Sequence, residues 1–344
     1  MATQPSHARR SSLRFDGASG DISGVSTLAP SSATSLALPL DPLVAQKQLK
    51  ALVATVGQVI VGKESAIELA VTCLLARGHL LFEDLPGVGK TTLSQALARA
   101  LGLQFRRVQF TSDLLPADIL GASIFDRETS SFLFKPGPVF AQVLLADEIN
   151  RATPKTQSAL LEAMEEGQVT ADGMSHPLPE PFFVIATQNP TTQMGTFSLP
   201  ESQLDRFLMR LELGVPDREA ERAMLIGEDR REVLRHLTPA MTSDELRAMQ
   251  QCLKAVHVSP ALLDYLQDLL AASRQHGHGL SPRAGLALLA AARAWALMQG
   301  RPMVIPEDIQ AIGPAVMAHR LEHAVEGMTG RELAKRLLRE VAVV

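Results

Sequence analysis

The feature that most constrains this chain is a short apolar stretch joined to a helix by a glycine-rich loop. The stretch is His79–Glu83, the loop is Asp84–Gly89, and a helix is predicted from Lys90 to Leu101. A short apolar run bounded by glycines favours a buried strand. A buried strand that leads directly into a helix is the repeating unit of parallel α/β sheets, so the chain is expected to contain such a sheet.

Strands and helices are predicted to alternate beyond this unit. The further predicted strands are Phe105–Phe110, Val143–Ala146, Phe182–Thr187 and Phe207–Leu213. A helix is predicted over Pro154–Glu166, with Thr153 as its N-cap and Gly167 as its stop. This alternation implies a mainly parallel sheet covered by helices on both faces, which is a three-layer α/β/α fold.

The pattern divides the chain into three parts. Residues 1–40 are rich in Ser, Ala, Gly, Thr and Pro, and a disordered tail is expected there. Residues 41–215 are predicted to form the α/β domain, with Asp41-Pro42 opening its first helix. Residues 216–344 are predicted to form an all-helical domain, because only helix signals follow, such as the capped openings Ser259-Pro260 and Ser281-Pro282.

Charge and composition narrow the classes of function. The chain has 33 Lys and Arg against 37 Asp and Glu, and aromatic residues make up 4%. This balance argues against a protein that coats nucleic acid or stacks the bases of single strands. Two cysteines, Cys73 and Cys252, are too few for a disulfide scaffold. No segment reads as a membrane span or a secretory signal, so a cytoplasmic protein is expected.

The glycine-rich loop has the chemistry of a phosphate-binding site. Gly87 and Gly89 allow successive backbone N–H groups to face one anion, and the following helix adds its positive end. Lys90 would reach the outer phosphates of a nucleotide, and Thr91 would place its hydroxyl on Mg²⁺. The strict G-x-x-x-x-G-K-[ST] pattern asks for glycine where this chain has Asp84. The predicted nucleotide-binding residues of the loop are Pro86, Gly87, Val88, Gly89, Lys90, Thr91 and Thr92.

Two further strands end in polar residues that suit the same site. Asp147 and Glu148 follow an apolar strand, where ligands bind in open α/β sheets. Asp147 is expected to hold Mg²⁺ through water, and Glu148 to polarise the attacking water as a general base. Asn189 follows the next strand, and its amide would hydrogen-bond the γ-phosphate or the water. An ordinary Asn-Pro turn is the alternative for Asn189.

Four longer stretches carry a resemblance to a known family. They are Gln109–Gly121 (QFTSDLLPADILG), Ala146–Thr170, Phe182–Pro190 (FFVIATQNP) and Leu199–Phe207 (LPESQLDRF). On these stretches the chain resembles the MoxR family of AAA+ ATPases, from about Val56 to Glu340. The resemblance implies a P-loop NTPase α/β domain followed by a helical lid, with ATP and Mg²⁺ held between them. It also implies a homo-oligomeric ring, expected to be a hexamer, in which each subunit completes its neighbour's site.

The resemblance also assigns roles to single residues. Asn189 looks like the sensor of the γ-phosphate, and Arg206 looks like an arginine finger supplied in trans. An Asp205–Arg206 surface pair is the alternative for Arg206, and Arg151 is the rival finger. Arg283, at the start of a lid helix, matches the lid arginine that touches the γ-phosphate. Val61 and Gly62 match the main-chain contacts to adenine.

The expected function is a chaperone-like remodeller that hydrolyses ATP and acts on a protein client. The resemblance suggests a partner with a von Willebrand factor A domain. Two predicted hairpins, Ala122–Lys135 and Gln168–Pro177, would face the pore or the client. The alternatives are a nucleic-acid motor of the same fold and a nucleotide-gated scaffold with little turnover. His319 to His323 match the zinc-protease pattern H-x-x-E-H, but a solvated helix face is the preferred interpretation.

Overall fold

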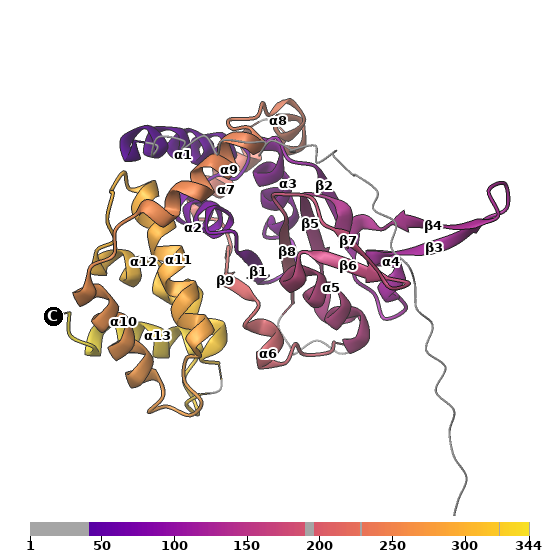
Figure 1. Ribbon diagram of the computed structural model, residues 1–344. Coiled ribbons are helices and arrows are strands. Elements are labelled where there is room, and N and C mark those ends of the chain that lie inside the picture. Colours follow the sequence, from indigo (N-terminus) through magenta and orange to yellow (C-terminus); the bar gives the residue numbers. More distant parts are fainter. Residues whose placement is uncertain (1–40, 190–195, 228, 323, 344) are drawn as a thin grey trace, which may run out of the picture. The chain divides into compact units, whose positions relative to one another are not determined.

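The computed structural model describes residues 41–189, 196–227, 229–322 and 324–343 (Figure 1). The predicted tail, residues 1–40, lies outside the described residues, so its disorder stays a prediction. Within the described ranges, none of the helices has the length and apolarity needed to cross a membrane.

Five parallel strands form the central sheet, as the alternation predicted. In chain order they are β1 (His79–Glu83), β2 (Phe105–Gln109), β5 (Val143–Asp147), β8 (Phe183–Gln188) and β9 (Phe207–Leu211). Their order across the sheet is β2-β5-β8-β1-β9. All carboxyl ends therefore meet at one edge, where the crevice for a ligand forms in open parallel sheets.

Helices precede, connect and follow these strands, and several begin at the caps that the sequence predicted. Asp41, Ser259 and Ser281 are N-caps whose side chains accept a backbone hydrogen bond, each followed by proline. The helices up to the last sheet strand are α1 (Pro42–Gly57), α2 (Glu64–Leu75), α3 (Lys90–Ala100), α4 (Pro116–Leu120), η1 (Pro138–Phe140), η2 (Ile149–Arg151), α5 (Pro154–Glu166) and α6 (Glu201–Leu204). Those after it are α7 (Arg218–Ile226), α8 (Arg230–His236), α9 (Ser243–Cys252), η3 (Leu253–Ala255), α10 (Pro260–Ser273), α11 (Pro282–Met298), α12 (Pro306–Met317), η4 (Ala318–Arg320) and α13 (Gly330–Glu340).

The two faces of the sheet are buried in two separate cores, because side chains alternate along each strand. Leu80 and Phe82 of β1 belong to one core, which also holds residues of α1, α2, α3 and the helices after β9. Leu81 belongs to the other, which holds residues of α5. The three-layer α/β/α fold with a helical lid is thus confirmed. The first core is continuous across residue 216, so a separate helical domain starting there stays a prediction.

Two antiparallel ribbons extend the fold where hairpins were predicted. One is β3 (Gly121–Asp126) with β4 (Ser131–Pro136), and the other is β6 (Gln168–Ala171) with β7 (Met174–Pro177). The β3–β4 ribbon projects away from the sheet (Figure 1). It exposes four large apolar side chains, two on each face: Ile124, Phe125, Phe132 and Leu133.

The end of α5 is fixed to the start of β1 through the half-buried side chain of His79. The His79 ring accepts a hydrogen bond at Nδ1 from the Val184 N–H (2.9 Å), so Nε2 donates to the Met164 carbonyl (3.3 Å). Burial lowers the pKa of His79 to about 4, which keeps the ring neutral at physiological pH. α5 ends at Gly167, whose φ of 63° is left-handed. The carboxyl end of α5 is therefore held against the amino edge of the sheet.

Candidate nucleotide site

The loop between β1 and α3 has the backbone geometry of an anion cradle. Gly87 and Gly89 have φ values of 87° and 98°, in the left-handed region that favours glycine. A Cβ on either glycine would meet no atom within 4 Å, so the space above the loop is open. α3 begins at Lys90 directly after the loop. The free N–H groups and positive end of this helix point toward the same space.

Asp84, which departs from the strict phosphate-loop pattern, anchors the loop. Its Oδ1 accepts a hydrogen bond from the Leu85 N–H (2.8 Å), and its Oδ2 accepts one from the Gly214 N–H (2.6 Å). Gly214 lies just beyond β9. The aspartate thus joins the start of the loop to the segment that leaves the last strand.

Lys90 and Thr91 lie where the two halves of the predicted site meet. Lys90 is buried, and its Nζ donates to the Asp84 carbonyl at 2.5 Å. Burial lowers the pKa of Lys90, while the carboxylates of Asp84, Asp147 and Glu148 oppose that shift. The Thr91 hydroxyl donates to Asp147 Oδ2 at 3.5 Å. The structure thus brings the phosphate loop and the acidic pair together.

Asp147 is held by two side chains that sequence reasoning did not identify. The Thr187 hydroxyl donates to Asp147 Oδ1 at 2.6 Å, and Arg107 Nη2 lies 2.6 Å from Oδ2. Arg107 is on β2, next to β5 in the sheet. Only the register between these strands shows that an arginine two residues from the end of β2 reaches this carboxylate.

Glu148 is held from three sides in a strained conformation. Its φ of 57° is left-handed, which is uncommon for a residue with a Cβ. Asn189 Nδ2 donates to Oε1 at 3.1 Å, and Gln109 Nε2 donates to Oε2 at 3.0 Å. Arg151 Nε forms an ion pair with Oε2 at 2.8 Å. Arg151, the rival finger, therefore contacts the acidic pair of its own chain, and Gln109 is a further partner that sequence reasoning missed.

These residues fit a nucleoside triphosphate with Mg²⁺. The open loop offers backbone N–H groups, and Lys90 offers a cation beside them. Thr91 and Asp147 offer neighbouring oxygens, which are the ligands that Mg²⁺ prefers when phosphates and water complete its shell.

The segment predicted to contact adenine is joined to the same stretch of chain as the phosphate loop, the residues that follow β9. Gly62 has a φ of 71°, and a Cβ there would lie 2.8 Å from the Ala220 Cβ. Lys63, the next residue, donates from Nζ to the Val215 carbonyl at 2.8 Å. Because Asp84 binds Gly214, the Val61–Gly62 segment and the phosphate loop are both attached to consecutive residues after β9.

Arg206 and Arg283 lie at the opposite edge of the sheet. Phe207, which follows Arg206, pairs with His79 at the start of β1, whereas the phosphate loop follows the end of β1. The two ends of this five-residue strand are about 13 Å apart. Both arginines form ion pairs with Glu165 at the end of α5. The structure thus does not bring them to the phosphate loop of their own chain.

The pocket around these arginines is rich in positive charge. It has a volume of about 300 Å³. Its charged residues are Arg77, Arg206, Arg283, Arg320, Glu165 and Asp205. Arg320 is paired with Asp205 at 2.6 Å. One carboxylate, Glu165, therefore remains to balance three arginines.

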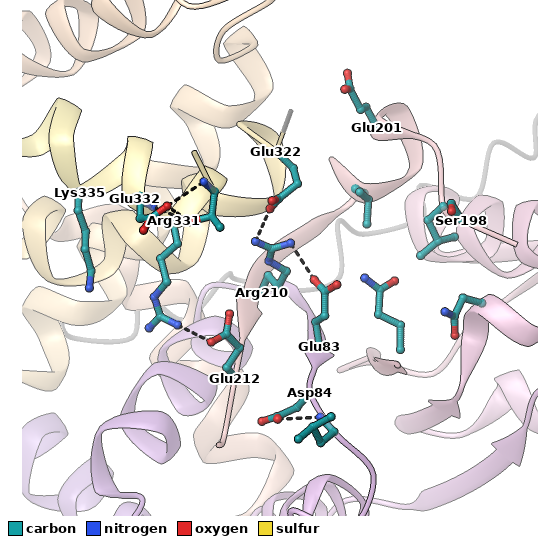
Figure 2. Close-up of a pocket in the computed structure, with 16 residues that line it drawn as sticks. Glu83, Asp84, Ser198, Glu201, Arg210, Glu212, Glu322, Arg331, Glu332 and Lys335 are labelled. Carbon is teal, nitrogen blue, oxygen red and sulfur yellow. Dashed lines mark hydrogen bonds and ion pairs between the residues drawn. The ribbon is translucent and has the colours of Figure 1, made fainter. Parts of the chain in front are cut away.

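A larger pocket beside the phosphate loop is mainly acidic (Figure 2). Its volume is about 750 Å³. Arg210 on β9 bridges Glu83 (2.7 Å) and Glu322 (2.6 Å), and Arg331 on α13 pairs with Glu212 (2.9 Å). These ion pairs tie the ends of β1 and β9 to the lid. The charged residues lining the pocket are Glu83, Asp84, Glu201, Glu212, Glu322 and Glu332 against Arg210, Arg331 and Lys335.

The histidine pattern near the C-terminus does not form a solvated helix face, which corrects the preferred interpretation. His319 is buried in the short helix η4, and its Nε2 lies 3.0 Å from the Phe207 carbonyl. Burial holds the pKa of His319 well below its usual value. His323 lies outside the described residues. Among the residues that are described, no group of three or more His, Cys, Asp or Glu side chains is placed to hold a metal.

Known proteins resemble this chain in sequence and in fold. Residues 79–209 match the ATPase family associated with various cellular activities (AAA), and residues 270–340 match the AAA lid domain. The Bacillus subtilis protein YeaC is 43% identical over 84% of this chain and 92% of its own. The Mycobacterium tuberculosis Chaperone MoxR1 is 41% identical over 77% and 73%, and the Paracoccus denitrificans Protein MoxR is 35% identical over 78% and 86%. A crystal structure from Cytophaga hutchinsonii is similar with a TM-score of 0.78 and 34% identity, over 88% of this chain and 97% of its own.

Proposed function

The chain belongs to the MoxR family of AAA+ ATPases, and from this we propose that it binds ATP with Mg²⁺ and hydrolyses it to ADP and phosphate. The observation that carries the proposal is the meeting of Thr91 with Asp147 beside the buried Lys90. This arrangement supports binding of the phosphates by Lys90 and binding of their Mg²⁺ by Thr91 and Asp147.

Each polar group of the site then has a stated task. The backbone N–H groups of the loop from Pro86 to Thr92 and the Lys90 ammonium would bind the phosphates. Mg²⁺ held by Thr91 and Asp147 would supply neutralisation of the charge on the transferred group. Glu148 would accept the proton of the attacking water, and Asn189, hydrogen-bonded to Glu148, would orient that water against the γ-phosphate. Val61 and Gly62 would contact the adenine.

The positions of Arg206 and Arg283 favour work on a neighbouring subunit. Both lie at the amino edge of the sheet, about 13 Å from the phosphate loop of their own chain. They are therefore proposed to act in trans in a ring, which we expect to be a hexamer. The charges support head-to-tail contact, because the amino edge of the sheet carries excess arginine and the pocket beside the phosphate loop carries excess carboxylate.

The work of the ring is proposed to be chaperone-like remodelling of a protein client in the cytoplasm. The name of the Mycobacterium tuberculosis relative supports a chaperone role. The β3–β4 ribbon, with apolar side chains exposed on both faces, is the surface we assign to the client. A protein with a von Willebrand factor A domain is proposed as the partner that brings the client.

The assembly part of this proposal predicts a concentration-dependent rate. Because each site would need arginines from a neighbour, the ATPase rate per subunit should be low at nanomolar concentration and rise to a plateau as rings form. Malachite-green phosphate assays across a dilution series, paired with light scattering, measure this. A rate per subunit that stays constant while the scattering mass changes would contradict trans completion. Stimulation by duplex DNA, lost at high salt, would instead support the nucleic-acid motor.

A further inference from the structure

One carboxylate at the amino edge of the sheet contacts both arginines that we assign to the neighbouring site. Glu165 Oε2 lies 3.0 Å from Arg206 Nη2, and Glu165 Oε1 accepts a hydrogen bond from Arg283 Nη2. Arg206 precedes β9, and Arg283 opens the lid helix α11. A single side chain therefore fixes the spacing between a cation of the α/β part and a cation of the lid.

The ion pairs of Glu165 with Arg206 and Arg283 add little to the stability of the fold. The side chains of Glu165 and Arg283 are 34% and 50% exposed, and that of Arg206 is 27% exposed. Ion pairs that water reaches contribute little to folding, because the solvent screens the charges and the long side chains lose freedom. Hydrogen bonding from Arg283 lowers the pKa of Glu165, so the carboxylate is ionised across the neutral range. Its stronger effect is on where the two guanidinium groups lie.

The helix that carries Glu165 is rigidly anchored at both ends. Near its start, the two N–H groups of Gln157 Nε2 lie within hydrogen-bond distance of three carbonyl oxygens, those of Ile149 (3.2 Å), Ala152 (3.1 Å) and Phe197 (3.2 Å). Ile149 follows Glu148 directly, Ala152 is the C-cap of η2, and Phe197 precedes α6. At its far end, the Met164 carbonyl binds His79. α5 has 13 residues, so the whole helix is about 20 Å long.

We propose that Glu165 is a positioning residue that presents Arg206 and Arg283, at a fixed spacing, to the nucleotide of the neighbouring subunit. The inference rests on the proposed function, because it needs the two arginines to act in trans. Guanidinium groups that are already placed lose less freedom when they meet phosphate, and small misplacements of reacting groups cost about 10²-fold in rate. Glu165 itself touches neither substrate nor Mg²⁺.

The first test replaces the carboxylate by an amide of the same shape. Glu165→Gln should lower kcat about 10- to 100-fold and leave the KM for ATP within about twofold, because the substrate site is untouched. Glu166→Gln is the matched control, since Glu166 is the exposed neighbour on the same helix end. A Glu165→Gln rate equal to that of the control would overturn the inference. Circular dichroism melting and ring size by light scattering exclude misfolding as the cause.

The second test separates a role in trans from any structural role. Glu165→Gln subunits keep their own Glu148, and Glu148→Gln subunits keep a well-placed arginine pair. Mixed rings should therefore hydrolyse ATP several times faster than the sum of the two variants alone. No gain on mixing would place the effect of Glu165 within its own subunit and overturn the inference. A wild-type protein with no turnover at all would overturn the proposed function as well, which distinguishes the two failures.

Discussion

Replacing Arg206 by alanine is expected to lower the ATPase rate by about 10³- to 10⁵-fold while ATP binding stays intact. Arg206 lies at the amino edge of the sheet, away from the phosphate loop of its own chain, so it should not contribute to nucleotide affinity there. Its guanidinium would neutralise charge that develops on the neighbour's transferred phosphoryl group. Steady-state phosphate release and equilibrium binding of a fluorescent ATP analogue measure the two quantities.

Two control variants make this prediction specific. Arg235→Ala removes an exposed arginine that pairs with Glu232 within α8 and lines neither of the two charged pockets, so it should keep the wild-type rate. Arg151→Ala removes the rival finger, which pairs with Glu148 of the same chain at 2.8 Å. If Arg151→Ala stops turnover and Arg206→Ala does not, the assignment of the finger to Arg206 is wrong.

The second large effect is expected for Glu148→Gln, which should lower kcat by about 10²- to 10⁴-fold. The amide cannot take a proton from water, yet its Oε1 still accepts the hydrogen bond from Asn189. The phosphate loop is unchanged, so the variant should bind ATP at least as tightly as the wild type and retain it. Single-turnover hydrolysis and the amount of bound ATP after gel filtration provide the measurement.

A nucleotide-gated scaffold would respond differently. If wild type and Glu148→Gln hydrolyse ATP equally slowly in the presence of the partner protein, the acidic pair is not used for turnover. A variant that loses ATP binding altogether would instead show that Glu148 is needed for the structure of the site.

Much of the fold is readable from the sequence because local signals and tertiary packing agree. The strand His79–Glu83 is correct at both ends, since an apolar run is framed by glycines. The helix Pro154–Glu166 is also correct at both ends, because Thr153 caps it and Gly167 takes the left-handed conformation that stops it. The sequence does not predict the short helix α4, because five residues are too few for a helical period to appear.

Some residues of the candidate site can be predicted from local motifs, and others only from the packing of the strands. Lys90, Thr91, Asp147 and Glu148 stand in contiguous motifs, and the structure brings them together as predicted. Arg107 and Gln109 reach the acidic pair only because β2 lies beside β5 with Gln109 opposite Asp147. That register is a property of the sheet. The one hint in the sequence is their spacing of two, which places both on one face of a strand.

Arg283 and His319 show that a local sequence pattern cannot predict which residue a side chain contacts in the tertiary structure. Arg283 stands at the start of a helix, where a cation is electrostatically unfavourable, and this is the local signal in the sequence that Arg283 has a role. Its contact with Glu165 joins residues 118 positions apart and has no local signal. We expect from the sequence that His319 lies on a solvated helix face. In the structure it is buried in η4, and its ring contacts the Phe207 carbonyl of β9.

The central claim is that Lys90 and Thr91 on one side and Asp147 and Glu148 on the other bind one ATP with its Mg²⁺. Isothermal titration calorimetry of MgATP into Glu148→Gln, with and without a second change Lys90→Ala, tests it directly. The account predicts stoichiometric binding to Glu148→Gln, lost in the Lys90→Ala double variant and weakened when EDTA removes Mg²⁺. Absence of heat with folded Glu148→Gln, or equal affinity with and without Lys90, would contradict it.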